Sequence, residues 1–533
     1  MISPLFQFNE QLEDISREVV NRSTQTLGRA WGSTAQDSFR LVLNDAALHE
    51  VNRLGRKGEG SNKYLEEWQR LARRIGRLDE HELRREIEKR VSYYTRDIAG
   101  YFDRRVYSFA TRVVPFGLSA LFNTTDLAQG FRQVRHLADR IQIQGPMSHL
   151  ADLARMGTLI IMPTHSSNLD SIVMGWSFTH ARLPPCVYGA GKNLFTNPLI
   201  GYFMKNLGAY RVDRRLGHVL YKDVLKCYSQ VLIERGYHSL FFPGGTRSRS
   251  GCVESKLKLG LLGSAQMAFS ERVQRGDDRP IFLVPVTINY PLVLEGETLV
   301  EDYLKDEGQA RYIIDDDEFS RFGRIFQYAT KVMGLDTSMV LRFGEPLDVF
   351  GNRVDKFGHS IGPSGHRLNP AEYLFRDGVY VPDPDRDSEL TRQAGEAVVE
   401  AYRRNTVVLP TNFLGFLLLE RERALSPQRD LFALLRTCGG ERHSKVDVGN
   451  QALKLRAKLM SLETQGALVL SEAVREQSIE GLLEEAVTSL SSYHLRPTVE
   501  QDEKGFYLRD PKMAFYYGNR LEPWAPELRE AMA

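Results

Sequence analysis

Short apolar runs separated by helical patterns mark the middle of the chain. Ile141-Gln142-Ile143-Gln144-Gly145 alternates apolar and polar residues with period two and stops at glycine, as a strand does. Further runs have the length and composition of buried strands and lie at 158–163, 185–189, 239–243, 281–288 and 339–343. An apolar stripe from Leu220 to Leu232, followed by Gly236, is typical of the helices between them. This alternation predicts an α/β domain over 136–350, with a mostly parallel sheet flanked by helices and ligands at the strand ends.

The regions on either side are expected to be mostly helical. Residues 1–135 form the predicted N-terminal helical region, in which interleaved Arg and Glu from Arg70 to Arg90 indicate a solvated helix. Residues 351–388 are rich in Gly, Pro, Asp and Arg, which predicts a long loop or linker. Residues 389–533 form the predicted C-terminal helical region, with one short strand near Gly505–Leu508.

Two apolar stretches raise the question of a membrane. Val106–Phe122 is interrupted by Arg112 and Pro115, so it is either a core helix pair, which we favour, or an interfacial element that dips into a bilayer. Val407–Leu419 is too short to span and is expected to pack on another domain. Because no segment offers the ~18 apolar residues of a span, we expect no transmembrane helix.

Composition narrows the class of protein. A chain of 533 residues exceeds one hydrophobic core, so two or three domains are expected. The net charge of +2 combines 70 basic and 68 acidic residues, which gives no bulk sign of nucleic-acid binding. Its four cysteines lack metal-ligand spacing and are expected to be free thiols in a reducing compartment. Glu10, Glu13 and Asp14 interrupt any apolar core near the N-terminus, so no signal peptide is expected.

The strand over 158–163 leads directly to candidate chemistry. Thr164-His165-Ser166-Ser167-Asn168 suits a turn and a helix start, and Asp170 falls in the first turn of the following helix. A histidine held by a carboxylate at the end of a sheet is a plausible general base. The spacing alone is weak evidence, because a histidine followed by an aspartate five residues later is common.

Two later segments add candidate anion-binding groups. Phe242–Gly251, FPGGTRSRSG, follows an apolar strand, and its glycines, including Gly245, allow backbone N–H groups to approach an anion. Arg247 and Arg249 in the same segment suit a bidentate clamp on phosphate, with an ordinary tight loop as the alternative. Gly208–Arg215, GAYRVDRR, brings Arg214 to a predicted strand end or else forms a surface charge cluster, and Lys258 adds positive charge nearby.

Together these segments resemble the conserved blocks of the glycerolipid acyltransferase superfamily. The first block, histidine and aspartate separated by four residues, matches PTHSSNLDS, and the second resembles GAYRVDRR with Arg214 at the family's arginine. The third resembles FPGGTRSRSG and the fourth VPVTINY, in the same order. Within the superfamily the chain looks most like the bacterial glycerol-3-phosphate and dihydroxyacetone-phosphate acyltransferases, through SKLKLGLLG, MVLRFGEPLDVF and MAFYYGNRLEPW. The resemblance covers residues from about 130 to the end.

The resemblance implies roles for particular residues. His165 would be the catalytic base and Asp170 would orient its ring, with backbone N–H groups of the next helix start as candidate oxyanion donors. Arg214, Arg247 and Arg249 would bind the acceptor phosphate, with Gly245 in their loop and with Lys192 and Lys258 further out. The acyl-donor groove would be bordered by Val284, Pro285 and Val286. The chain departs from the family at Gly244, where a glutamate is usual.

The activity implied is transfer of an acyl group from acyl-CoA or acyl-carrier protein to the sn-1 hydroxyl of glycerol-3-phosphate. Alternative acceptors are dihydroxyacetone phosphate and 1-acylglycerol-3-phosphate. A different class of function is that of a non-catalytic protein that binds lipid or an acyl donor. No metal and no cofactor are implied. Because the lysophosphatidate product partitions into bilayers, a peripheral location on the cytoplasmic face of the inner membrane is expected.

Overall fold

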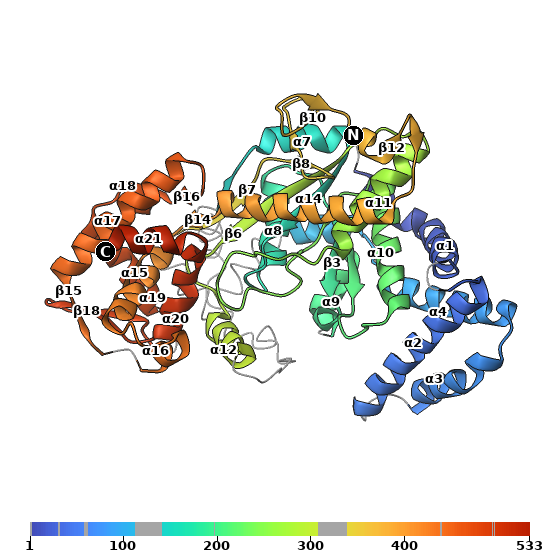
Figure 1. Ribbon diagram of the computed structural model, residues 1–533, viewed down its shortest axis with the longest axis horizontal. Coiled ribbons are helices and arrows are strands. Elements are labelled where there is room, and N and C mark those ends of the chain that lie inside the picture. The colour runs from blue at the N-terminus through green and yellow to red at the C-terminus, as the bar shows by residue number, and fades with distance from the viewer. Residues whose placement is uncertain are drawn as a thin grey trace.

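The apolar runs pair side by side in one mixed sheet at the centre of the molecule (Figure 1). The computed structural model describes residues 3–29, 32–57, 62–111, 141–196, 198–307, 338–437, 440–492, 494 and 496–533. Strands β6, β2, β5, β3 and β4 run parallel in that order, while β7 and β8 join β6 in antiparallel fashion. The α/β fold with a mostly parallel central sheet and helical flanking regions is therefore confirmed.

Strand bounds agree closely with the predicted runs in the central region. The strands of the large sheet are β1 (Ile141–Gln144), β2 (Thr158–Pro163), β3 (Val187–Gly191), β4 (Ala209–Val212), β5 (Ser239–Leu240), β6 (Ile281–Asn289), β7 (Met339–Phe343), β8 (Leu347–Asp348), β9 (Arg353–Val354), β10 (Ser360–Ile361) and β11 (Arg367–Leu368). The smaller sheets contain β12 (Phe375–Arg376), β13 (Val379–Tyr380), β14 (Val407–Val408), β15 (Arg442–Ser444), β16 (Val469–Leu470), β17 (Val499–Gln501) and β18 (Gly505–Leu508).

Helices surround the sheet and build both ends of the molecule. Those of the N-terminal and central regions are α1 (Phe8–Leu27), α2 (Ala35–Lys57), α3 (Asn62–Arg74), α4 (Glu80–Ile98), α7 (Met147–Met156), α8 (Asp170–His180), α9 (Pro198–Asn206), α10 (Val219–Glu234), α11 (Gly260–Gln274) and α12 (Gly296–Glu307). Those that follow are α14 (Pro384–Asn405), α15 (Pro410–Leu425), α16 (Leu431–Thr437), α17 (Lys445–Thr464), α18 (Glu472–Glu476), α19 (Ile479–Ser492), α20 (Pro511–Gly518) and α21 (Ala525–Met532).

Alternate residues of the central strands face opposite layers of helices. In β2, Leu159 and Ile161 belong to the core that includes α7 and α8, whereas Ile160 and Met162 belong to the core that includes α11 and α14. Because successive side chains of a strand point to opposite faces, a continuous apolar run is buried on both sides. The sheet is thus covered on both faces, and its strand ends remain as the place where polar side chains converge.

The N-terminal helices share a core with α10 (Figure 1). The charged segment 70–90, predicted as one solvated helix, is divided between α3 and α4. Asp79 begins α4 with a capping box, in which its side chain accepts from the Glu82 N–H and the Glu82 side chain accepts from the Asp79 N–H. Leu83, Ile87 and Val91 then form the buried face of α4, and its charged residues lie largely on the other side.

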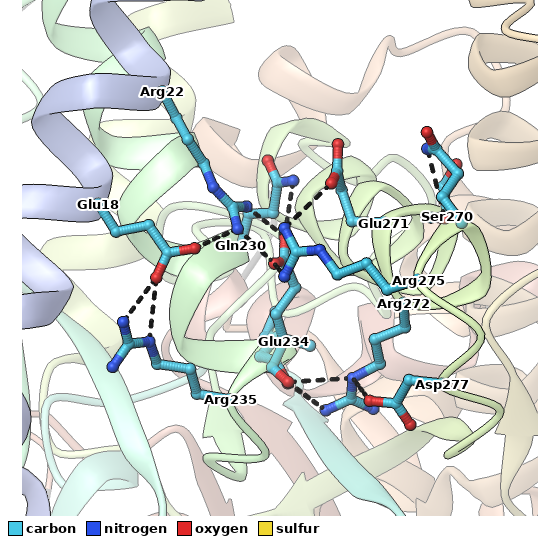
Figure 2. A network of polar contacts seen from close by, with 12 residues as sticks. Glu18, Arg22, Gln230, Glu234, Arg235, Ser270, Glu271, Arg272, Arg275 and Asp277 are labelled. Carbon is cyan, nitrogen blue, oxygen red and sulfur yellow. Dashed lines mark hydrogen bonds and ion pairs between the residues drawn. The ribbon is translucent and has the colours of Figure 1, made fainter.

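An ion-pair network fastens α1 to the central region (Figure 2). Arg22 of α1 donates to both carboxylate oxygens of Glu234 at the end of α10, at 2.7 and 2.9 Å. Glu18 accepts from Arg235, and the backbone carbonyl of Glu234 accepts from the buried Arg272 of α11. These contacts join three helices that are distant in sequence.

Residues 351–388 differ from the expected long loop or linker. β9, β10 and β11 pair in antiparallel register and extend the large sheet, and β12 and β13 form a separate pair. Gly358 and Gly365 have φ values of +85° and +80°, which suit the tight turns between the strands. Strands of two residues are too short to produce a visible alternation, so their Gly-rich turns dominate the pattern.

The C-terminal region begins with a helix that lies across the sheet. α14 packs on α11 and on β2, and the Tyr402 hydroxyl donates to the Met162 carbonyl at 2.9 Å. The apolar run 407–419 forms β14 and the buried first half of α15, which packs against α20. Within the described ranges, none of the helices combines the length and hydropathy that a membrane span requires. Most of Val106–Phe122 lies outside the described residues.

Candidate active site

His165 lies in the turn between the buried strand β2 and helix α8. Its Nδ1 is 2.7 Å from Oδ2 of Asp170, the first residue of α8, whose side chain has no exposed surface. The same oxygen accepts from the N–H groups of Ser166 and Ser167, and Oδ1 accepts from the Tyr290 hydroxyl at 2.7 Å. The turn therefore folds back on itself around the carboxylate, as the spacing predicted.

The imidazole is held on two sides. Its ring stacks on Phe242, with centroids 4.4 Å apart, and 15% of the side chain is exposed. Since Asp170 engages Nδ1, the tautomer it favours carries the proton there and leaves Nε2 as the basic nitrogen. This arrangement can accept a proton from a group that approaches the open side of the ring.

Four consecutive backbone N–H groups of the turn, those of residues 165–168, donate to carboxylates. His165 N–H donates to Glu254 Oε1 at 2.7 Å, and Asn168 N–H donates to Glu295 Oε1 at 3.0 Å. The N–H groups of Ser166 and Ser167 donate to Asp170, and Leu169 N–H donates to the Ser167 hydroxyl at 3.2 Å. Buried acids therefore engage the N–H groups of residues 165–168, and oxyanion donors at the start of α8 itself stay a prediction.

The glycine-rich segment is bound directly to His165. Ser248 N–H donates to the His165 carbonyl at 2.7 Å. Gly245 has a φ of +76°, and a Cβ there would lie 2.5 Å from Cδ of Lys258. Because only glycine leaves that space open, Lys258 can cross the loop at this point.

Three cationic side chains gather beside this loop. Arg214, after β4, lies within electrostatic range of Arg247, and Lys258 lies within range of Arg214. Partial desolvation, reinforced by the neighbouring cations, lowers the pKa of Arg214 and of Lys258. Arg247 is also 3.4 Å from the buried Glu295, whose carboxylate holds the His165 turn. The cations and the histidine thus belong to one connected site.

The other two residues predicted to bind the substrate, Lys192 and Arg249, have different surroundings from Arg214 and Lys258. Lys192 pairs with Asp97 of α4 at 2.9 Å and approaches Asp213 at 3.7 Å, so carboxylates of the protein already engage its ammonium group. Arg249 lies on the same loop as Arg247 and is half-buried. Its role in phosphate binding stays a prediction.

Val284, Pro285 and Val286 lie in the interior of the sheet. All three are buried in β6, where Val284 and Val286 have 0% exposure, and the Pro285 carbonyl accepts from Gly344 N–H. This burial differs from the expected edge of an open groove. A β strand paired on both sides and covered by helices exposes no side chain.

Sequence reasoning missed three acids and hydroxyls that build the site. Glu254, Glu295 and Tyr290 hold the turn or its aspartate, although none belongs to an obvious spacing motif. Tyr290 ends the segment VPVTINY, which we used only for the resemblance, and Glu295 follows five residues later. Their contacts depend on which loops meet at the sheet edge, and local spacing carries no signal for that.

The C-terminal region reaches two loops of the site. Asn519 donates to the Ser250 carbonyl at 2.9 Å, and the Tyr517 hydroxyl accepts from Val293 N–H at 3.0 Å. At Gly251, φ is +78° and a Cβ would lie 1.9 Å from the Tyr516 carbonyl oxygen, so glycine permits this close approach. α20 therefore backs the glycine-rich loop.

Sequence comparisons relate this part of the chain to known acyltransferases. Residues 146–289 match the family model described as Acyltransferase. Among curated relatives, the glycerol-3-phosphate acyltransferase of Pseudoalteromonas translucida (strain TAC 125) is 32% identical over 192 residues, which is 36% of this chain and 22% of the relative. That of Pseudomonas putida (strain KT2440) is 27% identical over 313 residues, which is 57% of this chain and 34% of the relative.

The matched regions thus span between about a fifth and a third of the length of these relatives. Residues 146–289, which match the family model, contain the histidine, its aspartate and the arginines of the site. The part of the chain that carries the candidate site is therefore similar to acyltransferases, and among the curated relatives to glycerol-3-phosphate acyltransferases.

Proposed function

We propose that the protein transfers a fatty acyl group from a thioester donor, acyl-CoA or acyl-carrier protein, to the sn-1 hydroxyl of glycerol-3-phosphate. One observation carries this proposal. The His165–Asp170 pair is joined through Ser248 and Glu295 to a group of cations that includes Arg214 and Arg247. A base beside a phosphate-binding group suits an acceptor that carries both a hydroxyl and a phosphate.

The proposed chemistry is direct transfer. His165 Nε2 removes the proton from the acceptor hydroxyl as its oxygen attacks the thioester carbonyl carbon. A C–O bond forms, the tetrahedral intermediate collapses, and the C–S bond breaks. The leaving thiolate takes the proton from the imidazolium. Asp170 keeps the ring in orientation and stabilises its positive charge during the reaction.

Arg214 is the residue that we propose as the main ligand of the acceptor phosphate. Like charges placed close together repel one another, and a bound dianion would relieve the repulsion between Arg214, Lys258 and Arg247. A guanidinium also matches a phosphate with two parallel hydrogen bonds. Because any phosphate monoester offers these contacts, the identity of the acceptor needs a direct assay.

A panel of acceptors and donors tests the proposal. Purified protein would receive palmitoyl-CoA or palmitoyl-carrier protein with glycerol-3-phosphate, dihydroxyacetone phosphate, 1-acylglycerol-3-phosphate or glycerol, the last as the control without phosphate. We expect acylation of glycerol-3-phosphate and none of glycerol, with loss of turnover in His165→Ala. Donor binding without turnover by the unaltered protein would instead indicate a non-catalytic binding protein.

We also propose that the protein works at a membrane surface. Phe109 and Tyr202 are 52% and 55% exposed, and the Phe109 ring stacks on Phe203 of α9. The basic residues Arg104 and Arg105 are exposed near Phe109 in the sequence, and Lys205 is exposed near Tyr202 in α9. Aromatic rings with basic neighbours suit the interface of an anionic bilayer.

Vesicle flotation tests this second proposal. Phe109→Asp with Tyr202→Asp should reduce binding to vesicles that contain anionic lipid, whereas Tyr64→Asp, at an equally exposed aromatic of α3, should not. Equal flotation of both variants would remove the proposed surface.

A further inference from the structure

Glu254 occupies an unusual position in the site. It follows the glycine-rich loop, is partly buried, and its Oε1 accepts the hydrogen bond of His165 N–H at 2.7 Å. Thus one end of the catalytic turn is fixed by this carboxylate, while Asp170 and Glu295 fix the rest. Arg520, 7% exposed in the 3-10 helix Asn519–Trp524, lies within electrostatic range of Glu254 and partly balances its charge.

The same carboxylate fills the space in front of Gly244. A Cβ built on Gly244 would lie 3.1 Å from Cγ of Glu254 and 3.2 Å from its Oε1. A longer side chain at residue 244 would therefore point into the volume that the Glu254 side chain now takes. Gly244 is also the position where the resemblance to the family leads us to expect a glutamate.

We propose that Glu254 is a positioning residue for His165, and that it supplies from a later point in the chain the carboxylate that the family resemblance leads us to expect at the position of Gly244. The inference rests on the proposed acyl transfer. It makes residues 244 and 254 a coupled pair, because the space at the turn admits one acidic side chain and the His165 N–H requires one acceptor.

Exchange of the two residues tests this coupling. Glu254→Ala leaves the His165 N–H without its partner, so kcat should fall about tenfold or more, with the acceptor KM within about threefold of its original value. Gly244→Glu alone crowds Glu254 and should also lower kcat. The double variant Gly244→Glu, Glu254→Ala should recover kcat to within about threefold of the unaltered protein.

A second measurement does not depend on turnover. Amide hydrogen exchange of the segment 164–170 should quicken in Glu254→Ala and slow again in the double variant, because the carboxylate returns to the His165 N–H. Glu254→Gln keeps an acceptor oxygen with nearly the same shape and should retain slow exchange. Glu301→Ala, which removes a surface carboxylate that is 53% exposed, is the matched control.

The outcomes separate this inference from the proposed function. An unaltered protein that acylates no acceptor would refute the proposed function, while the exchange pattern would still decide whether Glu254 holds the turn. Normal kcat and slow exchange in Glu254→Ala, or a double variant that recovers neither, would overturn the positioning role.

Discussion

Asp170 accepts four hydrogen bonds within the site, one from the imidazole, two from backbone N–H groups and one from the Tyr290 hydroxyl. A buried carboxylate with this many donors is fixed in place and ready to stabilise an imidazolium. Its rigidity comes from the turn, whose chain reversal brings Ser166 and Ser167 onto the same oxygen. The orientation of His165 is thus set by the fold of a few consecutive residues.

Loss of the Asp170 carboxylate, which orients the base His165, gives the first prediction at this scale. Asp170→Asn should lower kcat by about 10²–10⁴, because the amide no longer favours the proton on Nδ1 or stabilises the imidazolium. Steady-state turnover of glycerol-3-phosphate with palmitoyl-CoA measures the effect. His180→Ala, at the exposed end of the same helix, serves as control and should keep full turnover.

Tyr290 gives a smaller and separate effect. Tyr290→Phe removes one hydrogen bond to the Asp170 carboxylate, and such a bond to a charged group is worth about 1.5–3 kcal/mol. We expect kcat to fall by about tenfold with little change in either KM. A fall as large as that of Asp170→Asn would contradict a supporting role.

Glu254 makes stability depend on pH. Burial raises the pKa of its carboxyl group from an ordinary 4.5 to about 7. Between these values the folded protein binds more protons than the unfolded chain, so the free energy of unfolding falls as the pH rises through this window. Above pH 7 the full cost of the buried charge remains.

Glu254→Gln should remove this dependence. Urea titrations at pH 5, 6, 7 and 8 measure the free energy of unfolding of both proteins. The value for the variant minus that for the unaltered protein should increase as the pH rises, by up to about 3 kcal/mol. Parallel curves for the two proteins would show that the carboxyl group titrates normally.

At the scale of elements, the loop after β4 presents two adjacent arginines with different surroundings. Arg215 pairs with Asp213 at 2.9 and 3.0 Å, whereas Arg214 lies beside Arg247 and Lys258. One position therefore stabilises the loop and the other faces the cationic group. Their adjacency provides a matched pair of variants.

Arg214→Ala should raise the KM for glycerol-3-phosphate by about tenfold or more, since it removes a charge-assisted hydrogen bond worth about 1.5–3 kcal/mol. The donor KM should stay within about twofold. Arg215→Ala, tested in the same assay, should leave the acceptor KM nearly unchanged. Equal effects of the two substitutions would indicate that the loop acts through its folding alone.

Elements with strong local patterns could be predicted from the sequence. The strand 158–163 is six consecutive buried residues, and its end at Pro163 placed His165 correctly at the turn. The two-residue strands of 351–388 escaped prediction because their pairing depends on neighbours in space rather than on their own residues. Glu254 and Glu295 escaped for the same reason, since each reaches the turn from a separate loop.

The molecule as a whole is held together across long sequence distances. The N-terminal helices contribute no described contact to His165, yet they share a core with α10 and the ion-pair network of Figure 2. Glu234 in this network has a side chain that is 4% exposed. Loss of a charged partner from a buried carboxylate is costly even when other polar contacts remain.

Arg22→Met should therefore lower the free energy of unfolding by about 1–3 kcal/mol, because Glu234 loses two hydrogen bonds and keeps its contacts with Gln230 and Arg275. Chemical denaturation measures this change. Arg17→Ala breaks an ion pair whose side chains are 70% and 63% exposed, and should change the value by less than about 0.5 kcal/mol. Similar decreases in the free energy of unfolding of both variants would show that the buried ion pairs stabilise the fold no more than an exposed ion pair does.

The contacts of Asn519 and Tyr517 with the loops at Ser250 and Val293 also bear on synthesis. During translation the histidine turn emerges long before residues 511–524, so a nascent chain lacks the backing of its glycine-rich loop until that stretch has left the ribosome. Chains stalled before residue 511 should be inert, and chains stalled with residue 533 well outside the exit tunnel should turn over substrate. Enzymatic activity would then first appear when α20 has emerged from the ribosome.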